Sequence, residues 1–337
     1  MERVIQLLND RHPNLSKNSL YQVLVGRRTA TTLFFAVENQ VDAWLGVAPK
    51  LDKKIWLQRS QWTEQPILDE EYYGIFTYRL GTVPHYILAN YQNAFLLLLQ
   101  TLSYGRMKVT NYQPVTTSFQ AQQLVKHFYF SLRKTKWNNK GEMAQVVHDE
   151  LLTFFAEQPE KITEWYLELL VGYQVPAYTM SQMANETPYK VTEMSLLITA
   201  YFSKIFVHFL HTDSFLGHFF RFVLANQHPW NQSVEITYQF WQKGLTIEEI
   251  SHQRRLKPST INDHLMEIML YFPNPFIKKW EQMFKQSFKD WHATDLPKTF
   301  EEFRHCYGEK LPYWMMRLVK YYLSDGSLPL GGEWFDG

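Results

Sequence analysis

The sequence predicts an all-α protein. Glycine occurs only 14 times in 337 residues, and no segment of alternating apolar and polar residues persists. Apolar residues instead recur three and four positions apart, which is the spacing that places them on one face of a helix. We therefore predict a multi-helical N-terminal domain followed by a C-terminal helix-turn-helix domain.

Capping residues help to place the individual helices. Asp52 and Asp213 stand where an N-cap acceptor is needed, and Pro84 stands where a helix opens without needing its N–H group. Up to residue 243, the predicted helices cover residues 2–9, 19–25, 31–46, 53–62, 70–80, 84–104, 118–135, 141–157, 162–173, 180–185, 189–210, 214–225 and 234–243.

The polar, proline-containing stretch at residues 226–231 is the best candidate for a linker. We place an all-helical, partner-binding domain at residues 1–228, with a weaker break near 105–117. The helix-turn-helix domain then covers residues 229–325, and residues 326–337 form a glycine-rich tail that we expect to be loosely held.

Composition narrows the function classes. The net charge is only +1, and 13 basic and 14 acidic residues follow position 228, so DNA contact requires local patches. The single cysteine, Cys306, excludes an internal disulfide and a cysteine-based zinc site. The most apolar runs, 95–99 and 196–210, fall short of the roughly 20 apolar residues of a membrane span. We expect a cytoplasmic protein with no membrane partner.

Residues 234–271 have the pattern of a helix-turn-helix. Gly244 is suited to ending the first helix in the left-handed conformation. Thr246 and Glu249 have capping-box spacing at the start of the second helix, and Pro258 opens the third. The turn and the exposed face of the third helix supply the predicted DNA contacts, which are Arg254, Arg255, Lys257, Ser259, Thr260, Asn262, Asp263 and Met266.

Further cations are candidates for contacts to the DNA backbone. No acidic residue lies between Lys126 and Lys140, and this stretch contains a tryptophan that could stack on an unpaired base. The predicted backbone contacts are Lys243, Lys134, Lys136, Trp137, Lys140, Arg27 and Arg28. Against DNA binding, Asp263 and Glu267 place negative charge on the third helix, so docking to a protein remains an equal alternative.

These residues resemble a known domain. The segment GLTIEEIS at 244–251 resembles the helicase-type helix-turn-helix, as do Arg254, Thr260, Ile261, His264 and Leu265. That domain is found at the C-termini of RecQ-like helicases and in the YpbB-like proteins of Gram-positive bacteria. The opening motif of the YpbB-like family resembles SLYQVLVGRRT at 19–29, Thr31, Thr32 and WLGVAPKL at 44–51. The resemblance implies an accessory protein of a RecQ-like helicase in DNA replication, repair or recombination.

The sequence contains no positive sign of an enzyme. No glycine is followed by lysine, so there is no Walker A loop, and a helicase motor must belong to a partner. His208, His211, Asp213 and His218 come closest to a metal cluster, but they stand among phenylalanines and indicate packing. We therefore predict no metal, no cofactor and no catalysis. The alternative function is a transcriptional regulator that binds duplex DNA through the helix-turn-helix.

Overall fold

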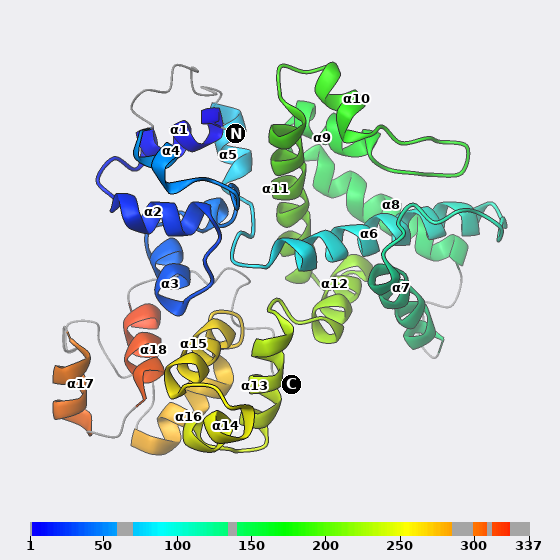
Figure 1. Cartoon of the computed structure of the whole chain (residues 1–337). Helices are drawn as coiled ribbons and strands as arrows, with labels where there is room; N and C mark the ends of the chain where they lie inside the picture. Colours follow the sequence, from blue (N-terminus) through cyan, green and yellow to red (C-terminus); the bar gives the residue numbers. More distant parts are fainter. Residues whose placement is uncertain (1, 59–69, 134–139, 285–298, 309–311, 324–337) are drawn as a thin grey trace. The chain divides into compact units, whose positions relative to one another are not determined.

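The computed structural model describes residues 2–58, 70–133, 140–284, 299–308 and 312–323, and it has the predicted all-α fold (Figure 1). Within these ranges the chain forms helices and no strand, apart from one isolated bridge between Gly172 and Val175. The predicted tail, 326–337, lies outside the described residues.

The chain divides into two compact units. Unit 1 comprises residues 1–16 and 46–229, and unit 2 comprises residues 17–45 and 230–337. The prediction that 1–228 form a single domain is therefore wrong for residues 17–45. These residues contribute buried apolar side chains, including Leu20, Val23 and Leu33, and the helix at residues 30–38 contacts the C-terminal helix at 258–269.

Unit 1 is built around one apolar helix, α11 (Val191–Leu210). The other helices of the unit are α1 (Glu2–Arg11), α4 (Lys53–Leu57), α5 (Glu70–Phe76), α6 (His85–Arg106), α7 (Phe119–Leu132), α8 (Lys140–Ala156), α9 (Glu160–Glu168), α10 (Met180–Asn185) and α12 (Phe215–Asn226). Phe202 and Phe206 of α11 pack with Phe220 of α12, which also lies against Phe95 of α6. Aromatic side chains thus form much of this core.

α11 is the one helix, among the described residues, that is long and apolar enough to cross a membrane. However, 72% of its most apolar window is buried inside the protein, and the helix contacts α5, α9, α10 and α12. This burial is typical of a core helix, because a membrane-spanning helix needs an apolar surface for lipid.

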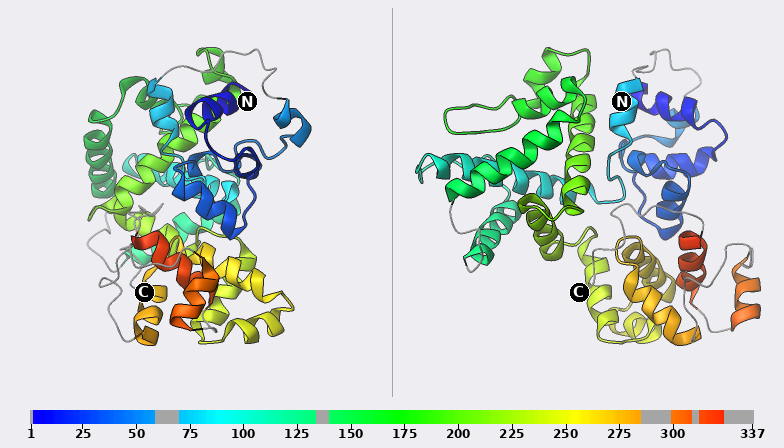
Figure 2. Two further views of the ribbon diagram at one scale, coloured as in Figure 1. Left: turned by 90° about the vertical axis from the view of Figure 1, so that its left-hand side faces the viewer. Right: turned by 180° about the vertical axis from the view of Figure 1, so that it is seen from behind.

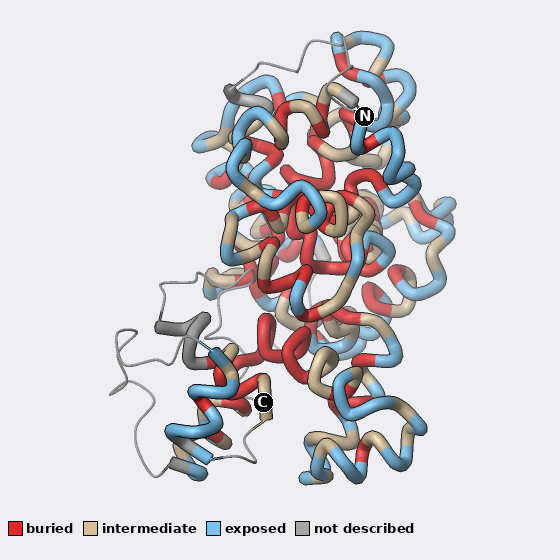
Figure 3. The backbone as a smooth tube through the Cα atoms, turned by 60° about the vertical axis from the view of Figure 1, so that its left-hand side comes forward, coloured by how far each residue is buried: buried red, intermediate tan, exposed pale blue. Residues whose placement is uncertain are grey.

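Unit 2 combines an N-terminal segment with the C-terminal helices. The segment contains α2 (Lys17–Leu24), α3 (Ala30–Glu38) and the short 3-10 helix η1 (Asp42–Trp44). The C-terminal helices are α13 (Gln232–Gln242), α14 (Ile247–Arg254), α15 (Pro258–Met269), α16 (Asn274–Phe284), α17 (Phe300–Tyr307) and α18 (Tyr313–Leu323). In each unit the buried positions, red in Figure 3, run along the inward sides of the helices.

Two predicted helix features are wrong in detail. Residues 31–46 form no single helix, because α3 ends at Glu38 and Gln40 takes a left-handed conformation with φ 56°. Asp213 is not the cap of α12; the neighbouring Ser214 is, and its hydroxyl accepts from the Gly217 N–H at 2.9 Å. Asp52 does cap α4 as predicted, accepting from the Lys54 N–H at 2.6 Å.

Candidate nucleic-acid interface

The first helix of the motif, α13, ends as its sequence predicts. Asn231 caps its start by accepting from the Val234 N–H at 3.0 Å. At its end Gly244 has φ 84°, in the left-handed region, and the N–H of Leu245 returns to the Phe240 carbonyl at 3.3 Å. This geometry uses the last carbonyls of α13 and directs the chain into α14.

The second helix, α14, starts with the predicted capping box. The Glu249 N–H donates to the Thr246 hydroxyl at 3.2 Å, and the Thr246 N–H donates to the Glu249 carboxylate at 2.7 Å. The hydrogen bond from the Thr246 N–H, followed by the one from its hydroxyl, lowers the pKa of Glu249. The carboxylate is therefore ionised at neutral pH and close to the positive end of the helix dipole.

The turn between α14 and α15 is closed by its own hydrogen bonds. Arg255 takes a left-handed conformation with φ 52°, which costs more for arginine than for glycine. The Leu256 N–H returns to the Ser251 carbonyl at 3.1 Å, and the Ser251 hydroxyl donates to the Leu256 carbonyl at 2.5 Å. Lys257 then occupies the N-cap position without a side-chain cap, and Pro258 opens α15. Ser259 and Thr260 lie inside α15 and therefore do not cap it.

The third helix, α15, is covered along most of its length. It contacts α13 and α14 on one side, as in any helix-turn-helix, and also α3 and α18 (Figures 1 and 2). All residues from Leu265 to Met269 are buried. Met266, a predicted DNA contact, is only 3% exposed. It is excluded from a DNA surface, because α15 is a central helix of unit 2.

Arg254, predicted to bind a phosphate, instead joins the first two helices. Its guanidinium donates to the Thr237 hydroxyl and, at 2.9 Å, to the Ser233 hydroxyl, both on α13. The Thr237 hydroxyl also lies 2.7 Å from Nδ1 of His264 on α15. Burial, with the nearby Arg254 charge, lowers the pKa of His264 to about 4. The ring is therefore neutral at pH 7, and its contact with Thr237 is a hydrogen bond between two uncharged groups.

Arg28 and Asp263 also have internal roles. Arg28 forms an ion pair with Glu267 of α15, whose side chain is 3% exposed. Burial raises the pKa of Glu267, and the Arg28 charge opposes this rise. The carboxylate of Asp263 accepts from the Ala30 N–H at the start of α3. Two predicted DNA contacts thus hold the N-terminal segment on α15, and the acidic residues of this helix are matched from within the unit.

The remaining predicted contacts of unit 2 lie near the surface. Five are exposed, namely Arg255, Lys257, Ser259, Lys243 and Arg27. Thr260 and Asn262 are half-buried. Lys257 and Ser259 flank the N-terminal end of α15, where the helix dipole favours an anion. The described surface therefore presents cations at the turn and at the start of α15, and little of the helix beyond its first turn.

The predicted basic stretch of unit 1 is described only in part. Lys134, Lys136 and Trp137 lie outside the described residues, and Lys140 is the first residue of α8. Two histidines of unit 1 pack against aromatic rings: His208 lies on Phe154 with ring centroids 4.8 Å apart, and His218 lies on Phe128 with centroids 5.8 Å apart. In the described ranges, no group of three or more His, Cys, Asp or Glu side chains is placed to hold a metal ion.

The geometry of α13, α14 and α15 agrees with a comparison of the sequence. Residues 233–320 match the family model of a helix-turn-helix domain. Unit 2 therefore carries a helix-turn-helix domain, a class that many proteins use to contact DNA.

Over most of its length the chain is similar to Protein YpbB of Bacillus subtilis strain 168. The two are 24% identical over 340 aligned positions, which cover 90% of this chain and 92% of the relative. This similarity agrees with the expected resemblance to YpbB-like proteins, and it extends over both units. No solved structure matches the chain.

The long-range partners of these site residues were hard to predict from sequence. Thr237 and His264 looked like ordinary helical positions in the sequence. In the structure both contact the Arg254 guanidinium, from which they are 17 and 10 residues distant in the sequence. The one available sign was the acidic character of α15, because Asp263 and Glu267 on a DNA-reading face require partners elsewhere in the protein.

Proposed function

We propose that this protein is a non-catalytic accessory factor of a RecQ-like DNA helicase, acting in the cytoplasm in replication, repair or recombination. In this role its helix-turn-helix contacts DNA through phosphates rather than through base edges. The burial of α15 carries the proposal, because base reading requires the third helix to present a free face to the major groove.

The surface that remains suits phosphates. Arg255 and Lys257 are exposed on the turn, and Lys243 is exposed at the end of α13. Such cations bind the DNA backbone without reading sequence, and their contribution weakens as salt rises. The same surface disfavours a sequence-specific transcriptional regulator, since Met266 is buried and the half-buried Asp263 carboxylate accepts from the Ala30 N–H.

The helicase partner is supported by the sequence. The chain has the motifs of the helicase-type helix-turn-helix but lacks a glycine followed by lysine, so it has no Walker A loop of its own. A protein that carries such a domain without the motor fits an accessory role. Unit 1 is a second compact unit that is available to bind the helicase while the helix-turn-helix contacts DNA.

DNA binding is tested by fluorescence anisotropy on duplex, single-stranded and forked DNA at several salt concentrations. The double variant Arg255→Gln/Lys257→Gln is expected to bind every DNA form more weakly. On duplex DNA, the slope of log K against the logarithm of the salt concentration should become shallower by about 0.9 per lost phosphate contact. The matched control is Lys50→Gln/Lys54→Gln, which removes two exposed cations from unit 1 and should leave binding unchanged. Equal binding by both double variants would contradict the proposed surface.

The helicase contact is tested by mixing the purified full chain with a RecQ-like helicase of the same organism. A complex at micromolar concentration, measured by sedimentation, supports the accessory role, and its absence contradicts it. Selection from random duplexes addresses the alternative. An enriched sequence motif would favour a transcriptional regulator, whereas backbone contact predicts no enrichment.

A further inference from the structure

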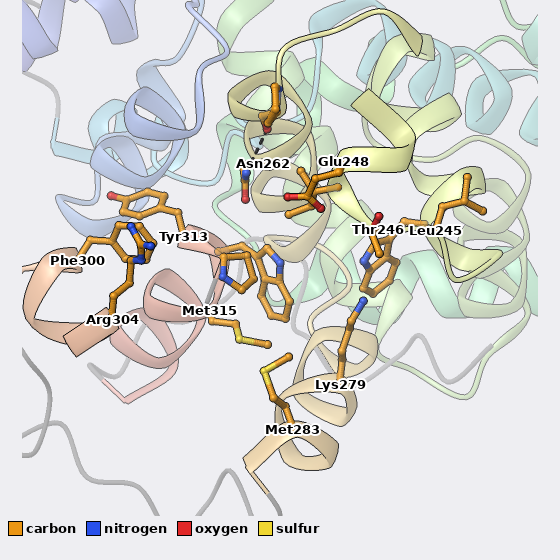
Figure 4. A pocket seen from close by; sticks show the side chains of 15 residues that line it. Leu245, Thr246, Glu248, Asn262, Lys279, Met283, Phe300, Arg304, Tyr313 and Met315 are labelled. Carbon is orange, nitrogen blue, oxygen red and sulfur yellow. Dashed lines mark hydrogen bonds between the residues drawn. The ribbon is translucent and has the colours of Figure 1, made fainter. Parts of the chain in front are cut away.

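Unit 2 contains a groove that borders the helix-turn-helix and includes none of the exposed cations Arg255, Lys257 and Lys243. It has a volume of about 720 Å³ and lies among the start of α14, the start of α15, and α16, α17 and α18 (Figure 4). Its walls are mostly apolar and include Trp241, Met283, Phe300, Tyr313 and Met315. The Met283 side chain is 48% exposed and adds to the apolar wall that an occupant could cover.

Two cations border these apolar walls. The Lys279 ammonium lies 5.4 Å from the centre of the Trp241 ring, and the Arg304 guanidinium lies 5.7 Å from that of Phe300. Figure 4 shows them on opposite sides of Met283 and Met315. Glu248 is the one carboxylate of the lining, so the lining side chains carry a net positive charge. The groove therefore favours an occupant with apolar groups in its middle and negative charge beside them.

One polar atom in the wall has no partner. The Asn262 amide nitrogen donates to the Pro258 carbonyl at 3.1 Å, while its Oδ1 atom is buried and accepts no hydrogen bond from the described residues. Figure 4 shows this oxygen on the side of the amide that faces Met315. A buried acceptor normally finds a donor, and an indole or backbone N–H group of an occupant would supply one.

This chemistry fits a peptide better than a nucleic acid. Methionine walls adapt to bulky apolar side chains, and an indole offers both a large apolar surface and an N–H donor. A nucleic acid would bring its phosphates close to Glu248. The chain itself contains the required combination, since Glu333 and Asp336 enclose Trp334 and Phe335.

We propose that the groove binds the segment Glu333–Asp336 of the same chain, with Trp334 or Phe335 between the methionine and aromatic walls and the acidic residues near Lys279 and Arg304. These four residues lie outside the described part of the chain, and it is their sequence that matches the groove. The proposal is independent of DNA binding and of the helicase.

The chain length allows this contact. Tyr313 at the start of α18 lines the groove, and α18 ends at Leu323 after 11 residues, a distance of roughly 16 Å at 1.5 Å per residue. The ten residues from Ser324 to Glu333 span up to about 33 Å when extended. They are therefore long enough to return from the end of α18 to its start.

The test measures binding of a fluorescein-labelled synthetic peptide with the sequence of residues 329–337 to full-length protein, by anisotropy. A tethered segment acts at a local concentration on the order of a millimolar, so it competes with added peptide. The double variant Trp334→Ala/Phe335→Ala removes this competitor. We expect it to bind the peptide at least about tenfold more tightly than the wild type does. Equal affinities, or no binding to the double variant, would overturn the proposal.

The site of binding is tested in the same double variant. Met283→Asp and Arg304→Glu should each weaken peptide binding at least about fivefold. The matched controls are Met107→Asp and Lys54→Glu in unit 1, which change an exposed methionine and an exposed lysine and should have no effect. Oligo-dT is added as a competing nucleic acid. If the groove variants bind the peptide as tightly as the control variants do, or if oligo-dT displaces the peptide, the groove is not the binding site of this segment. Circular dichroism checks that each variant is folded.

Discussion

Arg28 and Glu267 form a buried ion pair although 239 residues separate them in the sequence. The pair joins the loop before α3 to the last turn of α15. It explains how a helix at the centre of unit 2 contains a carboxylate that is only 3% exposed. Both residues looked like surface charges in the sequence, and the structure uses them to attach the N-terminal segment.

Arg28→Ala should destabilise unit 2 by about 3 kcal/mol, because it leaves the Glu267 carboxylate buried without its counter-charge. Urea unfolding followed by circular dichroism measures this change. The double variant Arg28→Met/Glu267→Leu removes both charges and should recover most of the loss. If the single variant is as stable as the wild type, the pair is not buried in solution.

A second prediction concerns the pH dependence of stability. The pKa of His264 is about 4 in the folded protein and 6.5 when unperturbed, so only the unfolded chain takes up its proton between these values. The contribution of His264 to the free energy of unfolding is therefore fully present above about pH 6.5. It is lost as the pH is lowered from 6.5 to about 4, and it does not change further below pH 4. The total loss is about 3 kcal/mol at 1.36 kcal/mol per pH unit.

His264→Asn provides the comparison for this prediction. Asparagine keeps an acceptor near the Thr237 hydroxyl but does not titrate, so the variant should lose less stability than the wild type between pH 6.5 and 4. Asp263 and Glu267 are present in both proteins, and their contributions cancel in the difference. Parallel curves of unfolding free energy against pH for the two proteins would contradict the prediction. They would show that the His264 imidazole takes up a proton as easily in the folded protein as in the unfolded chain.

Gly244→Ala should cost about 1 kcal/mol through the backbone alone. The φ angle of 84° is unfavourable for any residue with a Cβ atom, while an added Cβ would meet no atom within 4 Å. Gly244→Asn should cost less, because asparagine tolerates the left-handed region better. Thermal unfolding of the three proteins measures the order, and an alanine variant as stable as the wild type would contradict it.

Phe34→Ala tests the assignment of residues 17–45 to unit 2. Phe34 is 1% exposed, lies on α3 and has the Arg317 guanidinium of α18 5.5 Å from its ring centre. Its loss should reduce the hydrogen-exchange protection of α15 and leave that of α11 in unit 1 unchanged. Phe95→Ala, in the core of unit 1, should have the opposite effect. Loss of α11 protection in the Phe34 variant would place this segment in unit 1.

Local signals in the sequence predicted local structure well. The Gly244 conformation, the Thr246 capping box and the start of α15 at Pro258 each depend on residues within four positions of one another. The burial of α15 by α3 and α18 was not predictable in this way, because it depends on side chains more than 40 residues distant. Arg28 illustrates the limit, since an arginine before a helix has the same local sequence whether its partner is a phosphate or a carboxylate.

Membership of residues 17–45 in unit 2 has a consequence for synthesis on the ribosome. Arg28 is made long before Glu267, and at about 5–20 residues per second the interval is on the order of 10 to 50 seconds. During that interval α2 and α3 can pack on each other, but the face of α3 that contacts α15 has no partner. In a nascent chain this face of α3 is thus expected to stay exposed until α15 has left the ribosome, and faster translation shortens that exposure.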